Sequence, residues 1–244
     1  MQLKVLSTGS KANCYELQAK GSALLLDAGL PIATISKAVS FAGLQGCLIT
    51  HEHMDHGKAA ADMARRGVPV ITSPGTARAL KLTHPFVHTI KAGESMNLKD
   101  WEIIAFDTRH DAAEPLGFLI RHRATRETTL YATDTYYLRY RFPGTHYWIV
   151  EANYIDETLH RQLEEGNLPE AMAIRLKKSH MSLSRLIEAL KANDLSETRH
   201  IVLIHLSDSR SDERLMVEAI QEATGKPTTA ASDGEIINLE LQPF

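Results

Sequence analysis

The chain has 244 residues, of which 43 % are hydrophobic and 23 % charged, the balance of an ordinary soluble globular protein. Its net charge of −3 excludes a uniformly basic nucleic-acid coat but leaves room for a local basic groove. Cys14 and Cys47 have no C-x-x-C spacing and cannot build a disulfide framework, so we expect buried thiols in a reducing compartment. There is no membrane-length apolar run and no signal-peptide pattern at the first residues, so we expect a cytoplasmic protein without a membrane partner.

The first 81 residues predict strands and helices in alternation. Strands are predicted over 3–7, 14–18, 23–27, 44–50 and 69–72, and helices over 31–40, 58–66 and 76–81. Residues 87–131 then predict successive strands (87–90, 101–107, 116–121 and 128–131), and strands and helices alternate again from residue 148. Both halves mix sheet and helix without a Pro, Gly or Ser linker. We therefore predict one α/β domain over residues 1–244, a four-layer αββα sandwich.

Residues 50–57 contain the densest group of potential metal ligands in the chain. His51, His53, Asp55 and His56 follow the predicted strand 44–50, and the alternation of His51 and His53 directs both to one side of an extended segment. Nitrogen and oxygen ligands from one short loop suit zinc, manganese or iron. The competing interpretation is a polar loop that happens to be rich in histidine.

The pattern His51-x-His53-x-Asp55-His56 resembles the signature of the metallo-β-lactamase-fold hydrolases. That resemblance implies further ligands at later strand ends, where His110, Asp134 and His205 stand. It implies two divalent metal ions (zinc or manganese, with iron as an option). The matching ligands are His51, His53 and His110 for one ion, Asp55, His56 and His205 for the other, and Asp134 as the bridge.

The resemblance also implies a reaction. A hydroxide held between the two metals would be the nucleophile, with Asp55 among the catalytic residues. The ligand set has no cysteine, which argues against antibiotic hydrolysis. In this family an Asp at the position of Asp27 orients the metal loop, although a buried capping carboxylate is an equally good interpretation of Asp27.

A second set of residues suggests the substrate. Glu151 ends the apolar stretch 148–151, and Ser182 is a natural N-cap for a helix whose first turn holds Arg185. Free amides at the helix start, together with His180, Ser182 and Arg185, would cradle a phosphate. The alternative is an ordinary capped helix start.

Glu151-Ala and His180-x-Ser182 resemble motifs of metallo-β-lactamase-fold nucleases, and the pattern is closest to the small YycJ-like (WalJ-like) exonuclease branch. Ser179 departs from that pattern, since a glycine often stands there. The branch implies a DNA exonuclease in which His180, oriented by Glu151, protonates the leaving oxygen. Basic and aromatic residues also interleave over 136–142, where they could contact nucleic acid or form a solvated surface.

Two other functions stay open from the sequence. One is a small-molecule hydrolase of the same fold, such as a cyclic phosphodiesterase, thioesterase or lactonase. The other is a non-enzymatic protein whose metals only hold the fold, which predicts a closed coordination shell. Replacement of His180 by alanine separates the nuclease from a thioesterase, because a thioesterase needs the metal ligands but tolerates this change.

Overall fold

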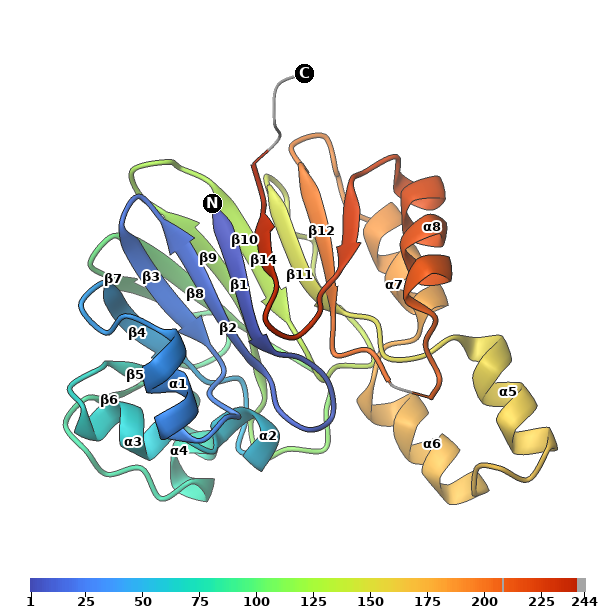
Figure 1. Ribbon diagram of the computed structural model, residues 1–244, viewed down its shortest axis with the longest axis horizontal. Helices are drawn as coiled ribbons and strands as arrows, with labels where there is room; N and C mark the ends of the chain where they lie inside the picture. Colours follow the sequence, from blue (N-terminus) through green and yellow to red (C-terminus); the bar gives the residue numbers. More distant parts are fainter. Residues whose placement is uncertain (208, 241–244) are drawn as a thin grey trace.

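The computed structural model describes residues 1–207 and 209–240, and within them two seven-stranded sheets pack face to face (Figure 1). The first sheet has the order β14-β1-β2-β3-β4-β5-β6. Its strands are β14 (Ile236–Asn238), β1 (Gln2–Ser7), β2 (Cys14–Ala19), β3 (Ser22–Leu26), β4 (Leu44–Leu48), β5 (Val70–Thr72) and β6 (Val87–Thr89). Strands β3 to β6 pair in parallel, while β14 to β3 pair antiparallel.

The second sheet has the order β13-β12-β11-β10-β9-β8-β7. Its strands are β13 (Thr228–Ala230), β12 (His200–Ile204), β11 (Tyr147–Glu151), β10 (Thr128–Ala132), β9 (Leu116–His122), β8 (Trp101–Asp107) and β7 (Ser95–Leu98). Strands β10 to β13 pair in parallel, while β7 to β10 pair antiparallel. Both sheets are therefore mixed.

Helices cover the outer face of each sheet (Figure 1). Beside the first sheet lie α1 (Ile32–Ala38), α2 (Met54–Gly57), α3 (Ala60–Arg65) and α4 (Pro74–Ala79). The second sheet is covered by α7 (Leu183–Lys191) and α8 (Glu213–Thr224), while α5 (Asp156–Glu164) and α6 (Glu170–Ser179) project beyond it. The predicted αββα sandwich is confirmed. None of the helices within the described residues has the length and apolar character needed to cross a bilayer.

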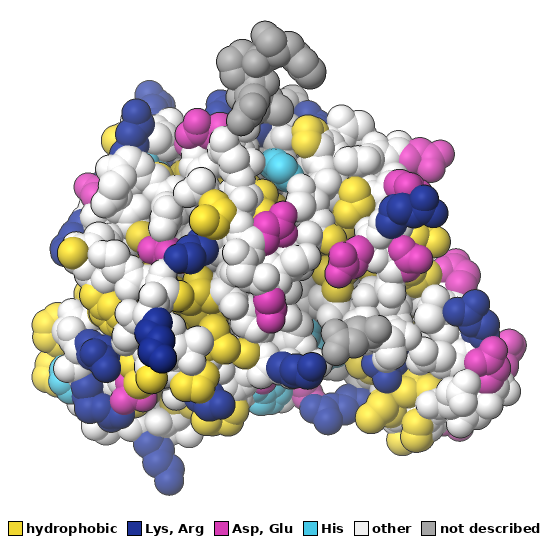
Figure 2. All heavy atoms as spheres, in the orientation of Figure 1, with side chains coloured by type: hydrophobic (Ala, Val, Ile, Leu, Met, Phe, Trp, Pro, Cys, Tyr) yellow, Lys and Arg dark blue, Asp and Glu magenta, His cyan; other side chains and the backbone are white. Residues whose placement is uncertain are grey.

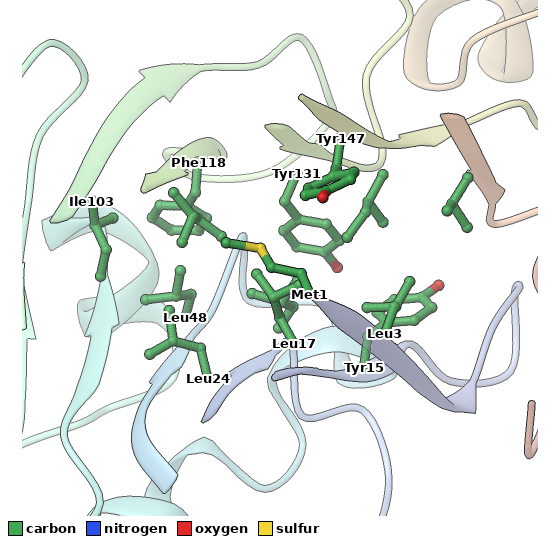
Figure 3. Close-up of a cluster of buried hydrophobic side chains, with 14 of the residues drawn as sticks. Met1, Leu3, Tyr15, Leu17, Leu24, Leu48, Ile103, Phe118, Tyr131 and Tyr147 are labelled. Atoms are coloured by element: carbon green, nitrogen blue, oxygen red, sulfur yellow. The ribbon is translucent and has the colours of Figure 1, made fainter. Parts of the chain in front are cut away.

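The core between the sheets comes from alternate residues of the facing strands. Leu24, Leu48, Ile103 and Phe118 are fully buried there, and Figure 3 shows side chains of the two sheets meeting. Separate apolar clusters lie under the outer helices, so each helix is held by its buried face rather than by propensity alone. In α7 that face is Leu183, Leu186 and Leu190, three residues at helical spacing.

Several elements differ from the sequence prediction. The strand predicted over 44–50 ends at Leu48, and the helix predicted over 58–66 is the shorter α3, preceded by α2, which had not been predicted. Strand β7 and helices α5 and α6 had not been predicted. The short segment Met54–Gly57 is helical because its amides bond back to the carbonyl of His53, which lets the chain turn immediately after the histidine strand end.

Candidate metal centre

The seven residues that the sequence suggested as metal ligands meet at one end of the sandwich. Each comes from a segment that follows a strand, so the sheets fix where the side chains start. The segment after β4 supplies His51, His53, Asp55 and His56; those after β8, β10 and β12 supply His110, Asp134 and His205. No ion is present in the structure, so the fit of these residues to a metal rests on their own geometry.

The first group of donors is formed by His51, His53, His110 and Asp134. His53 Nδ1 lies 3.1 Å from His51 Nε2 and 3.2 Å from His110 Nε2. Asp134 Oδ2 lies 3.3 Å from His110 Nε2 and 3.7 Å from His51 Nε2. Four ligands that surround a zinc ion tetrahedrally at 2.0–2.1 Å lie about 3.4 Å from one another, so these spacings fit a cation of that size.

Hydrogen bonds on the far side of two rings set their tautomers. His110 Nδ1 lies 2.9 Å from the carbonyl oxygen of Ser179, which can only accept, so His110 Nδ1 carries the proton. His51 Nδ1 lies 3.0 Å from Thr50 Oγ1, whose own hydroxyl donates to Asp27. Burial lowers the pKa of both His51 and His110, which keeps the rings neutral. Their Nε2 lone pairs therefore face the space between the four donors.

The second group is formed by Asp55, His56 and His205, with Asp134 beside it. His56 Nε2 lies 3.5 Å from Asp55 Oδ2 and 3.5 Å from Asp134 Oδ1. His205 Nε2 lies 3.3 Å from Asp134 Oδ1, yet it is buried and makes no hydrogen bond within the described residues. A buried ring nitrogen without a hydrogen bond is costly unless something else binds it, and a cation would.

Asp134 stands between the two groups, with Oδ2 toward the first and Oδ1 toward the second. Burial alone would raise the pKa of Asp134, but His205 and His56 outweigh burial and hold the pKa well below its ordinary range. The side chain is thus an ionised carboxylate with one oxygen for each group. Nitrogen and carboxylate donors in this arrangement can hold divalent metal ions.

Asp27 supports the cluster from behind. Its Oδ2 lies 2.8 Å from His56 Nδ1 and accepts a 2.6 Å hydrogen bond from the Tyr131 hydroxyl, while Oδ1 accepts from the Thr50 amide. A carboxylate behind a ligating histidine fixes its tautomer and orientation. Of the two interpretations of Asp27 from the sequence, orientation of the histidine loop agrees with these contacts.

Three residues at the cluster have a left-handed backbone. The φ angles are 55° at Asp27, 48° at Asp134 and 54° at His205. Such a conformation is uncommon for residues other than glycine and adds about 1–3 kcal/mol at each position. In each case it lies one or two residues beyond the end of a strand.

Beside the cluster, the fully buried Glu151 pairs with the partly buried His180. His180 Nδ1 lies 2.5 Å from Glu151 Oε1, and the His180 ring stacks on that of His205 at 5.3 Å between centroids. Glu151 Oε2 accepts from the amides of Thr135 and Met181. Burial opposes a charge on His180, but the Glu151 carboxylate outweighs burial and raises the pKa of His180 to about 9.

A pocket of about 370 Å³ opens over the donors, and His180 lines it together with His53, His110 and His205. Figure 2 shows histidine side chains at the lower edge of the face, with Lys and Arg side chains next to them. Arg175 of α6 also lines this pocket and forms an ion pair with Asp111 at 3.0 Å.

Ser182 and Arg185 are not brought to this pocket. Ser182 caps α7 as predicted, but its fully buried hydroxyl bonds to Ser184 and to the amide of Arg185. The Arg185 guanidinium donates to the carbonyl oxygens of Tyr136 and Lys177. Substrate binding by Ser182 and Arg185 stays a prediction, and their placement gives no support to a phosphate cradle at this helix start.

Asn13 is a site residue that the sequence reasoning missed. Its amide nitrogen lies 3.1 Å from His56 Nε2 and donates to the Gly9 carbonyl, so it links the loop after β1 to the donors. An Asn in a Gly-containing loop is so common in turns that the sequence alone gave no reason to select it.

The chain belongs to the family described as the beta-lactamase superfamily domain, whose model matches residues 23–206. Among known proteins it is 30% identical over 246 residues to exodeoxyribonuclease YycJ of Bacillus anthracis, covering 92% of this chain and 90% of that one. It is 27% identical over 228 residues to exodeoxyribonuclease WalJ of Streptococcus pneumoniae, covering 86% of this chain and 83% of that one. The predicted resemblance is thereby confirmed.

Solved structures agree on the fold. The metallo-beta-lactamase fold protein YhfI from Bacillus subtilis superimposes with a TM-score of 0.74 at 14% identity, covering 97% of this chain and 98% of that one. Family membership and the clusters of histidine and aspartate donors together make the protein a metal-dependent hydrolase.

Proposed function

We propose that the protein is a DNA exonuclease with a dinuclear metal centre. His51, His53 and His110 would hold one divalent ion, and Asp55, His56 and His205 the other, with Asp134 between them. Relatives that match most of the chain are named exodeoxyribonucleases, which is the reason for choosing DNA over other phosphodiesters. When bound, the ions would supply a nucleophile from water at neutral pH and neutralise charge on the phosphate.

The side chains of the protein would provide the remaining parts of the reaction. In His180, Nδ1 is held by Glu151, so Nε2 is the nitrogen available to a substrate in the pocket. A protonated His180 can donate that proton to the oxygen that leaves as the phosphodiester bond breaks. Glu151, fully buried, would keep the ring oriented and charged rather than contact the substrate itself. The Glu151–His180 pair beside the donor cluster is the observation that carries the mechanism.

The closest alternative is a small-molecule hydrolase of the same fold, acting on a cyclic phosphodiester, thioester or lactone. It uses the same donors and differs in what the rest of the pocket contacts. The two are therefore distinguished by substrate rather than by metal content.

The test compares polymers under matched conditions. Protein loaded separately with manganese and with zinc would be given end-labelled linear DNA, closed circular DNA and RNA. We expect shortening of linear DNA only, abolished by Asp134→Ala and strongly reduced by His180→Ala. His88→Ala, which replaces an exposed histidine on β6, is the matched control and should keep full activity. Cleavage of no polymer, with turnover of a small phosphodiester or thioester, would refute the exonuclease.

A further inference from the structure

The loop that follows Asp134 forms a second surface feature next to the metal centre. Residues 135–142 contain no helix or strand, and together with α7 they border a groove of about 210 Å³. We call it the Tyr–Arg groove. Its polar and aromatic lining consists mainly of Tyr137, Arg139, Tyr140, Arg141, Arg185 and Glu188.

The loop is anchored, so the groove is a defined surface. Leu138 and Phe142 are buried in the cluster under α7, and the Phe142 amide donates a 2.7 Å hydrogen bond to Asn193 just beyond that helix. The Thr135 hydroxyl donates to the carbonyl oxygen of Tyr137. The buried side chains of Leu138 and Phe142 thus flank the exposed residues 139–141.

Two aromatic rings stand open to solvent in this groove. Tyr137 is 53% exposed and Tyr140 is 38% exposed. Tyr140 is held in place because its hydroxyl donates to Asp107, and the Arg139 guanidinium lies 5.8 Å from the centre of its ring. Exposed aromatic rings beside arginine are the platforms on which proteins stack unpaired bases.

The charge of the groove favours a polyanion. Within the described residues, no carboxylate lies within 4.0 Å of a guanidinium nitrogen of Arg139, Arg141 or Arg185, and Glu188 is the one acidic residue of the lining. This local excess of positive charge belongs to a chain whose net charge is −3. A phosphate backbone complements it.

The loop that borders the groove starts directly after Asp134, so the groove lies close to the metal centre along the chain. Tyr137 is three residues after Asp134, so their Cα atoms are at most about 11 Å apart. The Tyr136 amide donates to the carbonyl oxygen of Arg109, the residue before His110. The same short segment therefore carries a candidate metal ligand at one end and the groove at the other.

We propose that the Tyr–Arg groove binds a single-stranded stretch of DNA whose terminal phosphodiester lies over the metal centre. Unpaired bases would stack on Tyr137 and Tyr140, and the guanidinium groups of Arg139 and Arg141 would contact phosphates. A duplex hides its base faces in its own stack, so the groove selects single strands. The inference rests on the proposed exonuclease function and adds to it the strand state of the substrate.

Binding and cleavage are measured separately to test this. The binding probe is a fluorescein-labelled single-stranded phosphorothioate DNA that resists cleavage, read by anisotropy with the metal-loaded protein. We expect Tyr137→Ala to weaken binding by about 5- to 150-fold, the effect of losing one stacked base, and Tyr137→Phe to bind like the parent. Phe86→Ala removes an aromatic side chain that is 42% exposed outside the groove and should change nothing.

The arginines are tested through salt. The double variant R139Q/R141Q should reduce the slope of log affinity against log salt by about 1.4, or about 0.7 for each lost phosphate contact on a single strand. A blunt duplex of the same sequence should bind more weakly, without a response to Tyr137→Ala. Melting temperature and metal content would show that every variant is folded and loaded.

The outcomes separate the two proposals. If the parent degrades DNA but Tyr137→Ala and R139Q/R141Q bind single strands as the parent does, the groove inference is wrong and the exonuclease stands. An equal loss of duplex and single-strand binding would also overturn the preference for single strands. If the parent binds single strands through the groove yet degrades no DNA, the exonuclease is wrong and the binding surface stands.

Discussion

Replacement of Glu151 by glutamine tests the orientation of the proposed general acid. The Glu151 carboxylate is fully buried, and each of its oxygens accepts hydrogen bonds. Oε1 faces His180 Nδ1, while Oε2 accepts from the backbone amides of Thr135 and Met181. Glutamine has one acceptor and one donor in place of two acceptors. Whichever way the amide turns, either two backbone N–H groups or the His180 N–H meets a donor instead of an acceptor.

The size of the effect follows from those contacts. A buried polar group left without its partner destabilises a fold by about 1–3 kcal/mol, which most domains with about 5–15 kcal/mol of stability survive. A positioned general acid contributes about 10²–10⁴-fold to rate. We therefore expect Glu151→Gln to fold, to bind metal and to cleave DNA about 10²–10⁴-fold more slowly.

The assay uses the chemistry of the leaving group. Departure of a sugar oxygen from DNA needs a proton, whereas p-nitrophenolate leaves without one. In Glu151→Gln and in His180→Ala, kcat on DNA should fall far more than kcat on the p-nitrophenyl ester of thymidine 5′-phosphate. Because the two residues act as one unit, the double variant should be no slower than His180→Ala.

Equal losses of kcat on the two substrates would refute the reasoning, since a general acid matters only where the leaving group needs its proton. Loss of bound metal in Glu151→Gln would refute it as well, because the effect would then come from the donors. Metal analysis and thermal melting of the same samples decide between these explanations.

Three further predictions concern the donor cluster. Asp27→Asn should lower the affinity for divalent metal by about 10–100-fold, measured by chelator competition. Tyr131→Phe removes only one of the hydrogen bonds to Asp27 and should have a smaller effect. Equal metal affinities of the two variants would contradict the role of Asp27. Removal of metal by chelation should lower the melting temperature by about 5–11 °C relative to protein at 100 times the dissociation constant, and reloading should restore it. Gly29→Ala would place a Cβ 1.8 Å from the carbonyl oxygen of Asp55. We therefore expect it to destabilise the fold by about 1–3 kcal/mol in urea unfolding and to weaken metal binding. Metal content and affinity like those of the parent would contradict a link between Gly29 and the donor loop.

The sequence could suggest the candidate donors because part of their signal is local. His51, His53, Asp55 and His56 occupy six residues, and a strand end is recognisable wherever an apolar run stops. The order of strands in each sheet then brings separate strand ends to one edge. That step needed the resemblance to a known family, because no local pattern specifies which strands pair.

The sequence predicted less well where the outcome depends on packing. Ser182 was correctly predicted as an N-cap, but only the fold shows that its hydroxyl is buried under the helix and directed away from the pocket. Helix α6 has little regular apolar periodicity, so neither it nor the position of Arg175 at the pocket was predicted. These features arise from contacts between distant segments.

The origin of the donors has a consequence for how the two sheets are held together. His51, His53, Asp55 and His56 follow a strand of the first sheet, whereas His110, Asp134 and His205 follow strands of the second. Each donor group therefore draws on both sheets, and any cation bound there is a cross-link between them. The apolar core holds the two sheets together in the interior of the sandwich, and bound metal would hold them together at the end where the donors lie. Loss of metal would therefore allow local opening at that end first, while the apolar core stays packed.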